Sequence, residues 1–179
     1  MTRFLVATAL AVCLPIAAHA ASSGDSNPPK PTSTTKVCEG GKVWDSKSKS
    51  CVAPSSGMLD DDALYDAIRE LAYYGQYDHA LTALDAMSDQ QDDRVLTYRG
   101  FAHRKAGNID TAMALYGKAL TANPDNILAR SYMGQGLVEM GLVDEARQQL
   151  SEIRQRGGRN TWAEYALRTA IEQGRGHNY

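Results

Sequence analysis

The 179-residue sequence lacks several features that would place it in a familiar class of protein. After residue 20 it has no apolar run long enough to cross a membrane as a helix. Three cysteines are too few for a cysteine-rich scaffold, and a formal net charge of −2 gives no basic excess for binding nucleic acid. These absences exclude a membrane-spanning protein, a cysteine-rich mini-protein and a nucleic-acid-binding protein.

The sequence also lacks the common motifs of catalysis and metal binding. It has no Gly-x-Ser-x-Gly, no Gly-x-x-x-x-Gly-Lys-Ser/Thr and no His-Glu-x-x-His. After residue 20 no histidine has a partner at metal-ligand spacing, and Asp60-Asp61-Asp62 lacks the alternating ligands and the glycine of a calcium loop. We therefore expect a protein that is not an enzyme, with no catalytic residues, no metal site and no cofactor.

What is present begins with the pattern of a secretory signal peptide at residues 1–20. Arg3 precedes a short apolar run that ends in Ala18-His19-Ala20, a small-x-small cleavage site. Cys13 faintly resembles a lipoprotein processing site, but bulky Val12 precedes it, so we favour cleavage after residue 20. The mature chain is then exported, with a net charge of −3 and two cysteines.

Residues 21–56 divide into two segments. Residues 21–36 have almost no apolar side chains and contain three prolines, so the sequence predicts a disordered, semi-stiff spacer. Residues 37–56 hold Cys38 and Cys51, whose pairing is the default in an oxidising compartment. Turn residues between them predict a small hairpin, which the disulfide would stabilise by about 3 kcal/mol.

Trp44 is the one large side chain of this predicted hairpin, and it allows two interpretations. The favoured one is that the indole covers the disulfide as a miniature core. The alternative rests on a resemblance to fragments of small disulfide-stapled modules, some of which bind chitin, and implies that Trp44 stacks on a sugar ring. The segment lacks the further cysteines of a full chitin-binding domain of that type.

The charge changes sign near Gly57, which predicts a domain boundary. Residues 21–56 contain five lysines and three acidic residues, whereas residues 57–179 contain 13 basic and 18 acidic residues. The second part is therefore a separate domain with a net charge of −5.

The domain at residues 57–179 contains an internal repeat. Three pairs of identical small residues stand 34 positions apart: Gly100 and Gly134, Gly107 and Gly141, Ala112 and Ala146. A shift of 32 positions places Gly75 and Ala80 in the same register. The repeat units are therefore residues 61–92, 93–126 and 127–160, and an apolar periodicity over residues 161–173 predicts one further helix.

These units resemble the tetratricopeptide repeat (TPR) family. The positions that carry the resemblance are Gly75, Ala80, Gly100, Gly107, Ala112, Tyr116, Pro124, Gly134, Gly141 and Ala146. Two positions depart from the pattern: Ile68 stands where a small residue is usual, and Gly158 stands where the family has proline. The resemblance implies an all-α, right-handed solenoid of three helix-turn-helix units, closed by a capping helix at residues 161–173.

The glycines have a physical reason in such a fold. Gly75, Gly107 and Gly141 fall at the turn inside each unit, where a left-handed backbone favours glycine. Gly100 and Gly134 fall inside helices, where glycine costs about 1 kcal/mol against alanine. We therefore expect a neighbouring element to approach closely at these two positions.

The family resemblance also implies where a ligand would bind. In TPR folds the first helix of each unit lines a concave groove, at unit positions 2, 5, 9, 12 and 13. The candidate groove residues obtained in this way are Tyr65, Arg69, Tyr73, Arg94, Phe101, Arg104, Lys105 and Gln135. Arg and aromatic side chains are enriched in binding hot spots, so we expect an acidic and apolar peptide segment as the partner. Arg69 and Phe101 stand where a chaperone-tail carboxylate clamp would have asparagines.

The leading hypothesis is therefore an exported adaptor that holds a protein or peptide partner. The mature chain resembles small exported TPR proteins of Gram-negative bacteria, which implies a periplasmic location and a second disulfide that is missing here. The first alternative is a cell-wall or glycan-binding protein acting through the Cys38–Cys51 segment. A further alternative is a homo-oligomer formed through the last helix.

Overall fold

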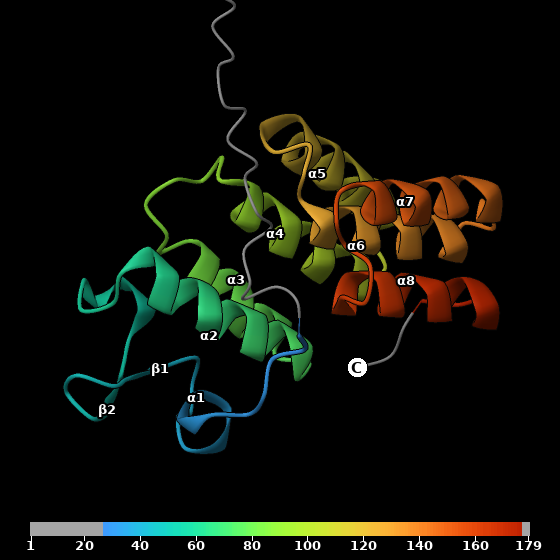
Figure 1. The fold of residues 1–179 in the computed structure, drawn as a ribbon. Helices are drawn as coiled ribbons and strands as arrows, with labels where there is room; N and C mark the ends of the chain where they lie inside the picture. Colours follow the sequence, from blue (N-terminus) through green and yellow to red (C-terminus); the bar gives the residue numbers. More distant parts are fainter. Residues whose placement is uncertain (1–26, 177–179) are drawn as a thin grey trace, which may run out of the picture.

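The computed structural model describes residues 27–176, and these form a repeat of paired helices preceded by a small hairpin (Figure 1). The predicted signal peptide and residues 21–26 of the predicted spacer lie outside the described residues. The seven long helices are α2 (Asp61–Tyr73), α3 (Tyr77–Leu84), α4 (Asp93–Lys105), α5 (Ile109–Ala122), α6 (Ile127–Glu139), α7 (Val143–Gln155) and α8 (Trp162–Gln173). Consecutive helices pair within each unit, and α8 packs on α6 and α7. The predicted helical-repeat fold is confirmed.

Each unit turns at its central glycine in the same way. Gly75, Gly107 and Gly141 have φ values of 77°, 85° and 79°. In each case the next residue donates its backbone N–H to the carbonyl five residues earlier, as in Gln76 N to Leu71 O at 2.8 Å. This bond satisfies a carbonyl that the end of the first helix would otherwise leave without a partner. The glycines thus fix the angle between the two helices of every unit.

The two mid-helix glycines admit a neighbouring side chain. A Cβ atom on Gly100 would lie 2.5 Å from Cε1 of Tyr116, and one on Gly134 would lie 2.6 Å from both Cδ atoms of Leu167. Tyr116 belongs to the second helix of the same unit, whereas Leu167 belongs to α8. Glycine at this unit position therefore admits the second helix of its own unit in the second unit, and the capping helix in the third unit.

The repeat register also places the small residues of the second helices in the core. Ala80, Ala112 and Ala146 are fully buried or nearly so.

The joint between the second and third units is held at the carbonyl oxygen of Pro124. It accepts hydrogen bonds from Arg130 Nη2 and from Arg156 Nε, both at 2.8 Å.

The hairpin consists of β1 (Val43–Asp45) and β2 (Ser50–Val52), followed by the short helix η2 (Pro54–Ser56). The strands are antiparallel, and the predicted disulfide joins Cys38 to Cys51. We call residues 37–56 the disulfide module. Val43 is buried, and Gly41 lies against the ring of His79 in α3. The module therefore covers the first unit as an N-terminal cap, at the opposite end of the repeat from α8.

Part of the predicted spacer, residues 27–36, lies within the described part of the chain. Residues 33–36 form a short helix, α1 (Ser33–Lys36), that packs against α2. The reason is a buried carboxylate: Glu70 accepts hydrogen bonds from Thr32 and Thr35, although both lie more than 30 residues earlier in the chain. Composition alone predicts disorder here because it does not reveal an acceptor supplied by a distant helix.

The close approach at Gly100 predicts opposite effects for two Gly→Ala substitutions. Gly100→Ala should lower the free energy of unfolding by about 1–3 kcal/mol, because the new methyl group overlaps the Tyr116 ring. Gly117→Ala is the control, since nothing lies within 4 Å of its added Cβ in α5 and alanine should stabilise that helix by up to about 1 kcal/mol. Urea unfolding of both variants measures the difference. Equal effects of the same sign would contradict the packing role of Gly100.

Candidate peptide-binding face

The first helices of the units lie in sequence, α2 beside α4, α4 beside α6, and α6 beside α8. We call the face formed by these four helices the first-helix face. All eight candidate groove residues belong to α2, α4 or α6. The structure brings them together in three clusters rather than in one continuous strip.

The first cluster surrounds Tyr65. The guanidinium carbons of Arg69 and Arg94 lie 5.8 Å and 5.0 Å from the centre of its ring, within the range of a cation–π contact. Arg94 also bonds Asp62 at 2.9 Å and Asp92 at 3.1 Å. These bonds raise the pKa of the guanidinium, so Arg94 is a fixed cation whose charge two carboxylates already balance.

The second cluster surrounds Phe101. Arg104 and Lys105 place their charged groups 5.6 Å and 5.7 Å from the centre of its ring. Arg104 forms an ion pair with Glu139 at 2.6 Å, and its side chain is buried with 0% exposure. It also donates to Gln135 Oε1 at 3.2 Å. The pair Arg104–Glu139 therefore links the second unit to the third.

Burial separates the candidates into two groups. Phe101 is 1% exposed and Gln135 is 0% exposed, so in this structure they act by packing and by hydrogen bonding. Tyr73, Arg94 and Lys105 are half-buried. Two of the basic candidates, Arg94 and Arg104, are balanced by acidic residues of the same face.

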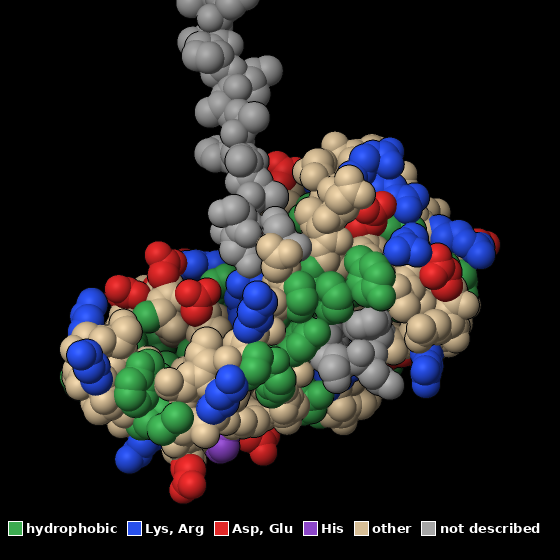
Figure 2. All heavy atoms as spheres, turned by 60° about the horizontal axis from the view of Figure 1, so that its bottom comes forward, with side chains coloured by type: hydrophobic (Ala, Val, Ile, Leu, Met, Phe, Trp, Pro, Cys, Tyr) green, Lys and Arg blue, Asp and Glu red, His purple; other side chains and the backbone are tan. Residues whose placement is uncertain are grey.

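The third cluster was only partly predicted. Tyr73 lies 6.2 Å from Trp162, centre to centre, although the two residues belong to α2 and α8. Trp162 stacks on Tyr165 at 5.5 Å, and Arg168 lies 5.5 Å from the centre of the Tyr165 ring. Figure 2 shows hydrophobic side chains gathered across the middle of the face that includes this region. The first and last helices therefore meet at an aromatic cluster of Tyr73, Trp162 and Tyr165.

A signal for the missed residues exists in the sequence. If residue 161 begins a fourth unit, Trp162 and Tyr165 occupy unit positions 2 and 5, the same positions as Asp62 and Tyr65 in the first unit. The apolar periodicity of residues 161–173 by itself predicts only a capping helix. The structure shows that α8 occupies the place of a fourth first helix, beside α6.

A second contact that the sequence did not predict lies at the N-terminal end of the face. The Glu70 carboxylate accepts from Thr32 N at 2.7 Å, from Thr32 Oγ1 at 2.6 Å, from Thr35 N at 3.1 Å and from the Thr35 hydroxyl. We call this arrangement the Glu70 clamp. On the neighbouring residue, Arg69 Nη2 donates to the carbonyl oxygen of Asn27 at 3.0 Å.

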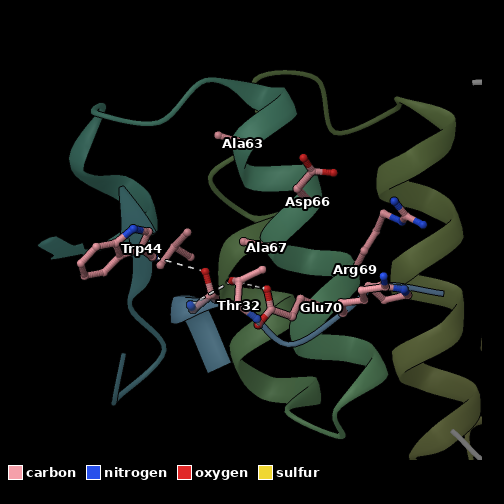
Figure 3. Close-up of a pocket in the computed structure, with 11 residues that line it drawn as sticks. Thr32, Trp44, Ala63, Asp66, Ala67, Arg69 and Glu70 are labelled. Atoms are coloured by element: carbon pink, nitrogen blue, oxygen red, sulfur yellow. Dashed lines mark hydrogen bonds between the residues drawn. The ribbon is translucent and has the colours of Figure 1, made fainter. Parts of the chain in front are cut away.

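A cleft of about 390 Å³ lies between α2 and the segment formed by residues 29–34 and β1 (Figure 3). Ala63 and Ala67 make room for it because their side chains are short. Figure 3 shows the Trp44 indole pointing away from these alanines and from Arg69. Trp44 is half-buried and lies opposite Cys51 in the strand register, which agrees with packing beside the disulfide.

The described part of the chain contains neither a metal-binding cluster nor a helix suited to span a membrane. Residues 27–176 contain no group of three or more His, Cys, Asp or Glu side chains arranged to hold a metal ion. No helix in the same range is both long and apolar enough to traverse a lipid bilayer.

Comparison with known families supports the TPR resemblance. A tetratricopeptide repeat family model matches residues 103–173, from the end of α4 to the last residue of α8. Comparisons with curated proteins and with solved structures gave no match. The match supports a TPR family for the second half of the chain, and it includes α8. TPR repeats generally mediate protein–protein interactions, and the repeat itself is not catalytic.

The Glu70 clamp predicts that a single isosteric substitution loosens the N-terminal segment. Glu70→Gln replaces one acceptor oxygen by an amide group that donates, so the four bonds from Thr32 and Thr35 cannot all form. We expect trypsin to cleave after Lys36, the last residue of α1, at least tenfold faster than in the native protein. Asp66→Asn, an exposed change one turn earlier in α2, is the matched control. Equal cleavage rates, followed by mass spectrometry, would contradict the clamp.

The lowered pKa of Lys105 predicts how the free energy of unfolding changes with pH. Burial, and then the charge of Arg104, lower its pKa to about 8 from an ordinary value of 10.5. Between these two pH values the unfolded chain binds more protons than the folded chain, so this residue makes stability rise with pH. Lys105→Met should therefore gain stability over the native protein at pH 7, and this gain should shrink as the pH is raised to 9.5. Thermal unfolding measures it, and a constant difference would show an ordinary pKa.

Proposed function

We propose that the protein is an exported adaptor that binds an extended segment of a partner protein on the first-helix face. The observation that carries the proposal is the cluster of Tyr73, Trp162 and Tyr165. These residues lie at opposite ends of the repeat in sequence, yet their rings are in contact. Trp and Tyr side chains with Arg168 beside them have the composition of a binding hot spot. The family match supports a protein partner in general terms.

The ion pairs on the face refine the partner's chemistry. A partner carboxylate near Arg94 or Arg104 would have to displace Asp62 or Glu139, so its net contribution is small. An apolar contact with an aromatic ring does not require an ion pair to be broken. The partner is therefore a segment that places apolar side chains on the aromatic cluster, with charge contributing mainly to the rate of association.

The location proposed for this adaptor is the periplasm. Its support is the signal-peptide pattern of residues 1–20, the resemblance to small exported TPR proteins of Gram-negative bacteria, and the Cys38–Cys51 disulfide, which belongs in an oxidising compartment. The same reasoning proposes a binding protein without catalytic activity.

A second candidate is glycan binding through the disulfide module. One observation favours it: strand alternation buries Val43 and Asp45 but leaves Trp44 half-buried, with its ring pointing away from α2. A partly exposed indole can stack on a sugar ring. The N-terminal capping role explains the disulfide module without any ligand, which makes the adaptor the better-supported function.

The test captures partners from an exported-protein fraction on the immobilised mature chain and identifies them by mass spectrometry. A double substitution of Tyr73→Ala and Tyr165→Ala should weaken the captured complex at least tenfold, because both rings are half-buried or exposed and belong to the aromatic cluster. Lys118→Ala, at an exposed position of α5, is the matched control.

Trp44→Ala separates the two candidate functions in the same assay. The adaptor proposal expects unchanged capture by this variant, and it falls if Trp44→Ala alone abolishes binding while the aromatic double variant retains it. Retention on insoluble glycan that depends on Trp44 would establish the second candidate. Light scattering of each variant shows whether captured chains are further copies of this protein.

A further inference from the structure

The inference concerns residues 27–31, Asn-Pro-Pro-Lys-Pro, which we call the strap. We propose that the strap is a built-in ligand of the first-helix face, and that the partner is an extended, proline-rich segment that replaces it. The inference rests on the proposed function, because it names the chemical class of the segment that the adaptor binds. Within the described residues, the strap contacts a candidate groove residue.

That residue is Arg69. Its Nη2 atom donates to the backbone carbonyl of Asn27 at 3.0 Å, while its guanidinium carbon lies 5.8 Å from the centre of the Tyr65 ring. Only about 8% of Arg69 is exposed. The aromatic contact holds the guanidinium plane in place, so the N–H group is oriented before any segment arrives. Arg69 therefore recognises a backbone carbonyl, which any extended segment can present.

The composition of the strap explains why proline suits this contact. Pro28, Pro29 and Pro31 each fix φ near −65° and remove a backbone N–H donor. The segment is therefore extended before binding, it keeps its carbonyl acceptors, and it loses little entropy when bound. Proline rings also pack well on aromatic faces, which is how other proline-rich segments are recognised. In α2, Tyr65 precedes Arg69 by one helical turn and Tyr73 follows it by one turn.

The strap is positioned so that it can be displaced without unfolding the disulfide module. The Glu70 clamp holds Thr32 and Thr35, on the module side of the strap. The cleft of about 390 Å³ is lined by Pro29 and Lys30 and by Ala63 and Ala67 of α2. Figure 3 shows Thr32 beside Glu70, with Arg69 on the side of α2 away from Trp44.

Tethering makes the strap a competitor of the partner. A segment held at one end by a short linker has an effective concentration of about millimolar at its own site. An external segment with the same contacts must compete with the strap. Its apparent affinity is its intrinsic affinity multiplied by the fraction of molecules in which the strap is not bound. Weakening the clamp lowers this effective concentration and should raise the apparent affinity of an added peptide.

The experiment measures the binding of a labelled, end-blocked peptide of sequence Asn-Pro-Pro-Lys-Pro to the full mature chain by fluorescence anisotropy. We expect Glu70→Gln to bind it at least tenfold more tightly than the native protein, and Asp66→Asn to bind it like the native protein. Adding Arg69→Met to Glu70→Gln should remove the gain. A peptide with glycine in place of each proline should bind the Glu70→Gln protein at least tenfold more weakly.

Native protein cleaved by trypsin between Lys36 and Val37 provides a second form without the strap and with every repeat side chain intact. It should bind the peptide as Glu70→Gln does. The inference is overturned if neither form gains affinity, or if the glycine peptide binds as well as the proline peptide. If that happens while a captured partner still depends on Tyr73 and Tyr165, the adaptor function stands and only the proline-rich partner is rejected. Loss of both dependences rejects the adaptor function as well.

Discussion

The structure depends on one constraint: every helix of the repeat must cover an apolar stripe of the helix before it, and no unit can do this alone. Gly100 and Gly134 show how closely the helices approach, because a single methyl group would overlap Tyr116 or Leu167. The constraint leaves two uncovered faces, one at each end. In this short repeat α8 covers the last face, and α1 with the disulfide module covers the first. The two appendages of the sequence are thus parts of one packing solution.

Features that repeat in sequence could be predicted, and features made by a single distant contact could not. The spacing of Gly107 and Gly141 predicted the turns, and the second unit begins at Asp93 as the repeat required. The groove positions followed from the same register, which would also have given Trp162 and Tyr165 had it been extended to α8. By contrast, the order of residues 32–35 depends on Glu70, and the charge at Arg104 depends on Glu139. No local pattern announces either partner, since each lies about one repeat away or more.

The first-helix face therefore attracts a partner carboxylate less strongly than its number of Arg and Lys residues suggests. A cation that already has a carboxylate at 2.6–3.1 Å gains little from a second one, because the new pair must first break the old. Aromatic rings, in contrast, can exchange one neighbour for another at small cost. We therefore propose that specific binding on this face rests on Tyr73, Trp162 and Tyr165, whereas the balanced charges hold the units in register.

Consecutive residues of α2 connect the cap to this face. Glu70 accepts hydrogen bonds from Thr32 and Thr35, and Arg69 donates one to the carbonyl of Asn27. Residues 27–32 therefore connect the first-helix face to the capped end of the repeat. On our proposal, a segment anchored in this way stays tethered to the repeat while the strap yields its contact to another chain. Because the clamp uses a buried carboxylate with four donors while the strap uses a carbonyl at the edge of a cleft, the two differ in strength. The strong contact completes the fold, and the weak one sets the threshold that an incoming segment must exceed.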